Sequence, residues 1–161
     1  MVGIQRYSDF IIFLLRVRQA NLFFLLFFSL KVTNMKFTFR GSIFNQDLSK
    51  WNTSSVTTMF GMFWYTNFNQ AMPDWDLSRV VDTSFMFSSN TRFNQDLSNW
   101  NMSSVTTMAH MFSHAHAFNS NISTWDVSKV TSLSRVFYNA KAFNSDLSTW
   151  DVSRVTTLHA T

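Results

Sequence analysis

Apolar residues recur along the chain at intervals of 24 or 25 residues. Five units begin with Phe-Asn and carry Trp at the eighth position, Ser at the eleventh and Val at the thirteenth. These units start at Phe44, Phe68, Phe93, Phe118 and Phe143, and the last is partial. A partial unit also precedes Phe44 in the same phase, starting near residue 29. The chain therefore divides into a repeat array over residues 29–161 and a separate segment over residues 1–28.

The repeat predicts a stack of similar coils. A unit of this length cannot bury its own Phe, Trp and Val side chains, whereas stacked copies place each one over its counterpart in a continuous core. We therefore expect a leucine-rich-repeat-like solenoid of about five coils, in the α/β or mainly β class. The predicted core positions are Phe44, Trp51, Val56, Phe68, Trp75, Val80, Phe93, Trp100, Val105, Phe118, Trp125, Val130, Phe143, Trp150 and Val155.

Each unit contains two different apolar patterns. The stretch that follows Trp, for example residues 125–133, alternates apolar and polar side chains and is rich in Val and Thr, which predicts a short parallel strand. The next stretch, for example residues 108–118, has apolar side chains three and four positions apart, which predicts a short helical turn. Glu is absent from the chain, and the scarcity of strong helix formers limits such helices to one or two turns.

Asn fills the second position of every unit, at Asn45, Asn69, Asn94, Asn119 and Asn144. We refer to these five residues as the asparagine column. Asn offers both donors and an acceptor, so a buried ladder of side-chain amides would satisfy backbone groups in the turns. A structural role is expected for this column. It is also expected for the five repeated Trp residues, in preference to an exposed aromatic surface for sugars or bases.

Acidic residues occupy the fourth and ninth positions of the unit, mostly in alternate coils. Carboxylates in adjacent coils about 4.8 Å apart would repel each other, and neutral residues between them roughly double the distance. Bases at position twelve accompany Asp at position nine, which indicates local charge pairs: Asp76 with Arg79, Asp126 with Lys129, and Asp151 with Arg154. Calcium is the alternative reading, although the Gly-rich loops of calcium-binding repeats are absent.

Three histidines cluster in one unit, at His110, His114 and His116. The spacing of His110 and His114 could place two imidazoles on one face of a helical turn. A zinc site would need a further ligand, which only an Asp or His159 could supply. A solvated turn is the preferred interpretation, so no metal and no cofactor is predicted.

The composition removes several chemistries. The 161 residues include no Cys, which excludes disulfides, thiolate nucleophiles and cysteine-ligated metals. The three glycines, at positions 3, 41 and 61, cannot form a phosphate-binding loop or a nucleophile elbow. No catalytic residue is predicted, and we expect a protein that is not an enzyme.

The positive charge is concentrated near the N-terminus. Residues 1–43 carry six bases and one acid, a balance of +5, whereas residues 44–161 carry seven bases and eight acids, a balance of −1. Nucleic-acid binding requires bases gathered on one face to displace counterions from phosphates. The repeat array has no such excess, so no nucleic-acid partner is expected.

The N-terminal segment combines basic and apolar residues. Its apolar run over residues 20–30 follows a basic stretch, as in a secretory signal, but no small-x-small cleavage site follows. A membrane span over residues 10–32 would hold Arg16 and Arg18 near its middle. Three interpretations stay open: a signal or anchor with N-terminal membrane association, a buried cap of the domain, and a non-native start of the reading frame.

The repeats resemble a known family. The pattern FNQDLSxWDVSxVTxMxxMF is matched from Phe44 onward, and in degenerate form from about residue 29. It resembles the BspA-like leucine-rich-repeat surface proteins, in the variant described as the mycoplasma-type lipoprotein repeat of unknown function. The resemblance implies a cell-surface or secreted location and binding of an extracellular protein or glycan through an elongated surface, without enzymatic activity. The chain has no lipobox cysteine, so a lipid-anchored form is not implied.

The sequence therefore favours a non-enzymatic surface or secreted module that binds a protein or glycan. The alternatives are a structural or spacer repeat, and a fragment of a longer surface protein without independent activity. The fifth unit leaves the apolar face around Trp150, Val155 and Leu158 without a following coil. An open strand edge with apolar backing is a template for pairing. We accordingly expect end-to-end self-association, or fraying of residues 143–161.

Overall fold

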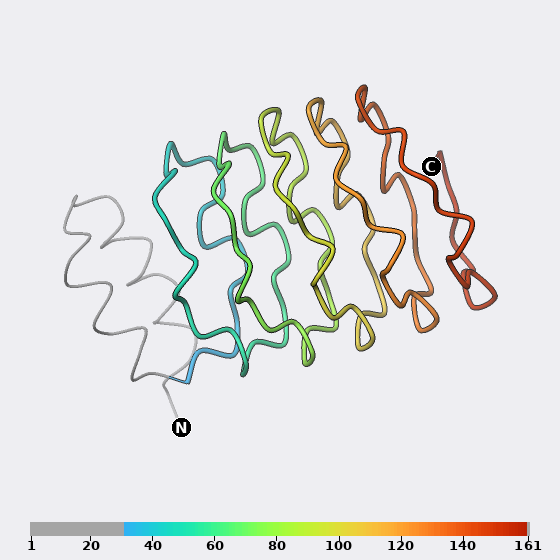
Figure 1. Ribbon diagram of the computed structural model, residues 1–161, viewed down its shortest axis with the longest axis horizontal. Helices are drawn as coiled ribbons and strands as arrows, with labels where there is room; N and C mark the ends of the chain where they lie inside the picture. The colour runs from blue at the N-terminus through green and yellow to red at the C-terminus, as the bar shows by residue number, and fades with distance from the viewer. Residues whose placement is uncertain (1–30, 161) are drawn as a thin grey trace.

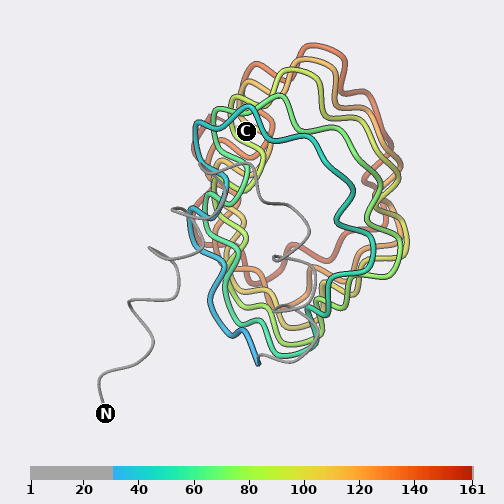
Figure 2. The ribbon, with the colours of Figure 1, turned by 90° about the vertical axis from the view of Figure 1, so that its left-hand side faces the viewer.

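The computed structural model describes residues 31–160. In this part of the chain the backbone winds through successive coils that lie side by side along one axis (Figure 1). Viewed along that axis, the coils superpose around a common interior (Figure 2). The predicted N-terminal segment, residues 1–28, lies outside the described residues. We number the coils one to six in the order 31–43, 44–67, 68–92, 93–117, 118–142 and 143–160.

Parallel bridges join neighbouring coils in register. The bridged residues all occupy position fifteen of the unit and are Asn34, Thr58, Asp82, Thr107, Ser132 and Thr157. Successive members are 24 or 25 residues apart, so the coil has the same length as the sequence repeat. The bridges are isolated, and residues 31–160 form no longer strand and no helix. The expected short parallel strand is thus one bridged residue per coil.

The segment expected to be helical forms consecutive β-turns instead. In coil one, the N–H of Thr38 donates to the carbonyl oxygen of Met35 (3.3 Å), and the N–H of Ser42 donates to that of Phe39 (3.0 Å). The third residue of each turn has a positive φ, as a type II turn requires. Coil by coil these residues are Phe37 and Gly41, Gly61 and Tyr65, Phe85 and Ser89, His110 and His114, and Arg135 and Asn139.

Backbone groups that a helix would use internally bind the next coil. The N–H groups of Phe37, Phe39 and Gly41 donate to carbonyl oxygens of coil two over 2.8–2.9 Å. An α-helix needs each N–H to bond four residues back in its own segment, so the predicted helical turn is not formed. The three- and four-residue spacing of Met and Phe arises from the paired turns.

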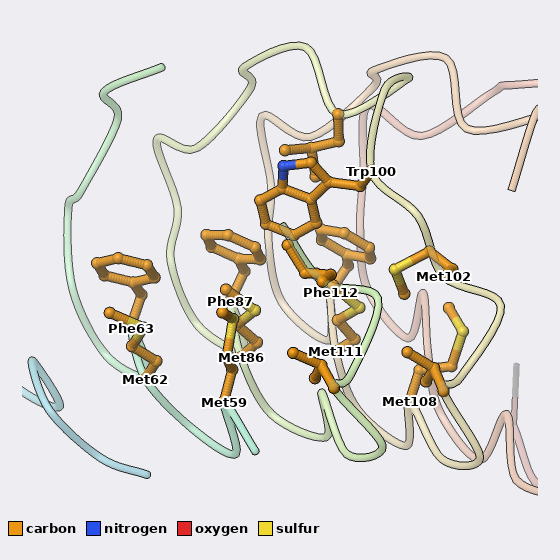
Figure 3. Packing of buried hydrophobic residues seen from close by; sticks show 14 of the residues in the cluster. Met59, Met62, Phe63, Met86, Phe87, Trp100, Met102, Met108, Met111 and Phe112 are labelled. Atoms are coloured by element: carbon orange, nitrogen blue, oxygen red, sulfur yellow. The ribbon is translucent and has the colours of Figure 1, made fainter. Parts of the chain in front are cut away.

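Columns of like side chains fill the interior. Twelve of the fifteen predicted core residues are buried, while Phe44, Phe143 and Val155 are partly buried and pack against the core near its two ends. The phenylalanines at position twenty also stack through the interior, at 5.5 Å from Phe63 to Phe87 and 5.7 Å from Phe87 to Phe112, with methionines beside them (Figure 3). The core therefore includes the Met and Phe positions of the turns as well as those predicted.

The asparagine column lies on the outside, which corrects the expectation of a buried ladder. Asn69 is half-buried and its four counterparts are exposed. The ladder itself is present, because the side-chain Oδ1 of each Asn accepts the backbone N–H of the Asn one coil later, over 2.8–3.1 Å. The Phe that precedes each Asn points into the core, and successive side chains of extended backbone point to opposite sides.

Coil six has more exposed apolar surface than the inner coils. Val152 is 49% and Leu158 is 63% exposed, whereas the equivalent Val127 and Leu133 of coil five are 1% and 3% exposed. Val127 and Leu133 are less exposed because coil six covers coil five. End-to-end self-association through this surface stays a prediction.

Candidate functional site

Several aromatic side chains lie on the outside of the turns and are not part of the buried core. We call Phe37, Phe60, Trp64, Tyr65, Phe85 and His110 the aromatic strip. Tyr65 is 60% exposed and the other five are partly exposed. The strip extends over coils one to four, so it is a surface that only the stacked coils create.

Ring contacts connect the strip from coil to coil. Phe60 lies 5.1 Å from Phe37 and 5.4 Å from Phe85 between ring centroids, and Phe85 lies 5.0 Å from Trp64. Phe85 and His110 stack at 4.3 Å with their planes within 9°. The two rings come from successive coils, and each covers one face of the other. Ring edges carry positive partial charge.

Two cations border the strip at coil one. Lys36 Nζ lies 4.7 Å from the ring centroid of Phe60, and Arg40 Cζ lies 4.4 Å from that of Trp64. Such contacts hold a cation over the negative face of a ring. The turn segments 35–41, 59–65, 83–89, 108–114 and 133–139 contain the bases Lys36, Arg40 and Arg135 and no carboxylate. The strip is therefore an aromatic surface with a positive border.

Burial affects the histidine of the strip. The pKa of His110 is lowered, first by its partial burial and then by the charges of Arg135 and His114. A lowered pKa favours the neutral imidazole, which stacks on Phe85 without bringing a charge into the ring contact. The strip thus keeps its charge at its border rather than at its centre.

The repeat pattern does not reveal the strip, because the residues of the strip do not recur from coil to coil. Position eighteen is Phe37, Gly61, Phe85, His110 and Arg135 in successive coils. Gly61 leaves the space that Phe37 uses, since a Cβ at residue 61 would lie 2.7 Å from two atoms of the Phe37 ring. The sequence signal was Trp64, which is the one Trp outside the eighth position.

The acidic columns serve the turns. Asp96 Oδ1 accepts the N–H of Ser98 (2.9 Å), and Asp126 Oδ1 accepts that of Ser128 (3.0 Å). Hydrogen bonds from the serine two residues later lower the pKa of these carboxyls, and of their counterparts Asp47, Asp76, Asp146 and Asp151. Asn52, Asn101 and Asn121 make the same backbone contact. Asp and Asn are therefore interchangeable in closing these turns.

The predicted charge pairs are looser than expected. Within residues 31–160 the one ion pair joins Lys50 Nζ to Asp74 Oδ2 at 3.0 Å, between two exposed side chains. Arg79, Lys129 and Arg154 act on Asp76, Asp126 and Asp151 as nearby charges that lower the pKa of each carboxyl, with a smaller effect than the serine hydrogen bonds. The acids of position nine are therefore oriented by the turn and not by the base.

The histidine cluster is rearranged relative to the sequence-based expectation. His110 belongs to the strip, whereas His114 and His116 approach each other with ring centroids 6.4 Å apart. Both rings contact the side chain of Asn139 in coil five. His159 is exposed in coil six. Within the described part of the chain, no three His or Asp side chains gather as a metal-binding group.

A family model described as "Mycoplasma protein of unknown function, DUF285" matches residues 27–88 and 64–161. No curated protein and no solved structure matches the chain. Among residues 31–160 there is no helix of sufficient length and apolar character to cross a membrane.

Proposed function

The chain belongs to the DUF285 family of Mycoplasma-type proteins of unknown function, and we propose that it is a non-enzymatic module that binds an extracellular protein or glycan. The observation that carries the proposal is the aromatic strip. Aromatic side chains with one polar or exposed end are enriched where proteins recognise partners. Aromatic side chains inside the stack form the core, whereas the aromatic side chains of the strip lie on the outside.

The charges of the strip favour an acidic partner. The side chains of Lys36, Arg40 and Arg135 present positive charge, and the turn segments themselves contain no carboxylate. Asp82, one residue before the turn of coil three, accepts the N–H of Ser84 through Oδ1. Carboxylates or sulfates of a protein or glycan would complement this surface. One face of Phe85 and one face of His110 are covered by each other, which leaves less aromatic surface for stacking of a neutral sugar ring.

The finer family assignment and the location are part of the proposal. We infer a BspA-like, leucine-rich-repeat-like solenoid that is displayed on the cell surface or secreted. The in-register bridges support the solenoid, and the basic and apolar composition of residues 1–28 supports export. Fractionation of cells that produce the full chain tests the location, and recovery only in the cytosol would contradict it.

A spacer is the second candidate, because each coil contacts mainly its neighbours and the stack can be extended without altering a coil. Spacer and binder differ in their dependence on surface residues. A spacer tolerates changes in the strip and responds to the number of coils, whereas a binder loses its partner when the strip is altered.

An array of extracellular proteins and acidic glycans tests the binding proposal. We expect the full-length chain to bind a subset of the array and the double variant Trp64→Ser/Phe85→Ser to lose that binding. Val81→Thr is the matched control, because Val81 is 45% exposed and the equivalent residues of other coils are Thr. Equal binding by the wild type and the strip variant would contradict the proposal.

A further inference from the structure

Two imidazole nitrogens converge on one atom between coils four and five. The side-chain Nδ2 of Asn139 lies 2.9 Å from Nδ1 of His114 and 3.4 Å from Nε2 of His116. An amide nitrogen can only donate hydrogen bonds, so both ring nitrogens direct lone pairs toward it. Two lone pairs directed at one point are the arrangement that a metal ion requires of histidine ligands.

We propose that His114, His116 and Asn139 form a binding site for a divalent transition metal such as Zn²⁺ or Ni²⁺. Imidazole suits these ions, whereas Mg²⁺ and Ca²⁺ prefer sites built only from oxygen. An ion at this point displaces Asn139 Nδ2, and a turned amide can then present Oδ1 to the ion, because the two ends of an amide are nearly equal in shape. The site then offers two nitrogens and one oxygen, and water completes the coordination.

Contacts between the coils hold the site together. The N–H of His114 donates to the carbonyl oxygen of Tyr138 (2.7 Å), and the N–H of Ala142 donates to that of His116 (3.2 Å). The His114 ring also meets the Tyr138 ring edge to face at 5.3 Å. The backbone of each histidine is thus fixed to the coil that carries Asn139.

The surroundings of the site set its strength. The titratable and charged residues of the same turns in coils three to five are Arg92, His110, Arg135, Tyr138 and Lys141, and none is a carboxylate. With three neutral ligands and a positive neighbour, the bound ion keeps its full charge and at least one exchangeable position. We therefore infer a labile site that takes up metal reversibly. It does not depend on the proposed binding function of the strip.

Titration calorimetry of the untagged full chain with ZnCl₂ and NiCl₂ at pH 7.5 tests the site. We expect one ion per chain, no heat from MgCl₂, and a loss of affinity of about 10-fold or more in both His114→Ala and His116→Ala. His159→Ala is the matched control and should bind as the wild type does, because His159 lies in coil six. Unchanged zinc and nickel affinity in either site variant, or no heat with the wild type, would overturn the proposal.

The variant Asn139→Asp tests whether Asn139 is a metal ligand or has only a structural role. A carboxylate is a stronger ligand for zinc than an amide oxygen and offsets the charge of Arg135, so we expect this variant to bind about 10-fold more tightly. A structural role for Asn139 predicts equal or weaker binding. Acidification should weaken zinc binding to the wild type, since imidazole binds metal only when unprotonated. This result remains decisive even if a histidine variant does not fold, and an affinity that does not change with acidification would contradict ligation by histidine.

Discussion

The indole Nε1–H of Trp125 donates a hydrogen bond to the carbonyl oxygen of Leu97, 2.9 Å away and 28 residues earlier in the chain. The same oxygen accepts the N–H of Trp100 at 3.0 Å. Trp75, Trp100 and Trp150 donate in the same way to the preceding coil. Tryptophan therefore recurs because it fills the interior and also satisfies a buried carbonyl group between coils.

Replacing Trp125 should separate these two roles. Trp125→Phe keeps an aromatic ring but loses the bond to Leu97, which should cost about 0.5–1.5 kcal/mol in addition to any cavity. Trp125→Ala should cost about 3–5 kcal/mol. Urea denaturation of the two variants measures both losses. If Trp125→Phe unfolds at the same urea concentration as the wild type, the indole hydrogen bond does not contribute to stability.

Thr83 is a polar residue in a position that other coils fill with Met or Leu. It is fully buried, and its hydroxyl has no hydrogen-bond partner. Thr83→Val keeps the shape and removes the unpaired hydroxyl, so we expect the free energy of unfolding to rise by about 1 kcal/mol. Thr66→Val is the control, because the buried hydroxyl of Thr66 donates to Phe63 O at 2.8 Å. Stability should fall in that variant, and a fall in both would contradict the account of Thr83.

The glycines at positions 41 and 61 differ in what surrounds them. Both have positive φ, but a Cβ meets nothing within 4 Å at Gly41, whereas at Gly61 it lies 2.7 Å from the Phe37 ring. Gly41→Ala should therefore cost only the backbone strain, about 1–2 kcal/mol. Gly61→Ala should cost more and displace Phe37 from the strip. Thermal unfolding compares the two, and equal melting temperatures would argue against the packing of Phe37 over Gly61.

Acid should destabilise the turns through the acidic columns. The serine hydrogen bonds lower the pKa of Asp96 and Asp126 in the folded protein. A lowered folded pKa gives a stabilisation that is present above the unfolded value, about 3.9, and is lost as the pH falls through the folded value. In Asp96→Asn/Asp126→Asn we expect a smaller fall in melting temperature between pH 5 and pH 2, with little change at pH 7. An identical acid dependence in this variant and the wild type would refute the role of these carboxylates.

The period of the sequence predicted which residues share a column and most of those that are buried. It did so because each coil repeats the environment of the previous one, so Trp51 and Trp100 meet the same surroundings. The period did not distinguish inside from outside for Asn94, since a structural Asn recurs on either side. It also favoured a helical turn around Met108 and Phe112, because paired β-turns bring residues three and four apart to one side as a helix does.

The repeat pattern does not predict the aromatic strip or the histidine site. Phe85, His110 and Arg135 occupy one position and share no chemistry, so a search for recurrence sets them aside. Their proximity depends on the register between coils. Similarly, Asn139 meets His114 because the second turn of coil five lies beside that of coil four. Helical spacing suggested His110 as the partner of His114 instead.

Binding measurements on two opposite kinds of variant test most directly whether the stack presents a binding surface. The first variant is Trp64→Ser/Phe85→Ser, which alters the strip and keeps the number of coils. The second carries an extra copy of residues 93–117 after residue 117, which adds a coil and leaves the strip from Phe37 to His110 in place. Against the array ligand that the wild type binds, we predict lost affinity for the first variant and wild-type affinity for the second. Retained affinity in the strip variant would contradict the account.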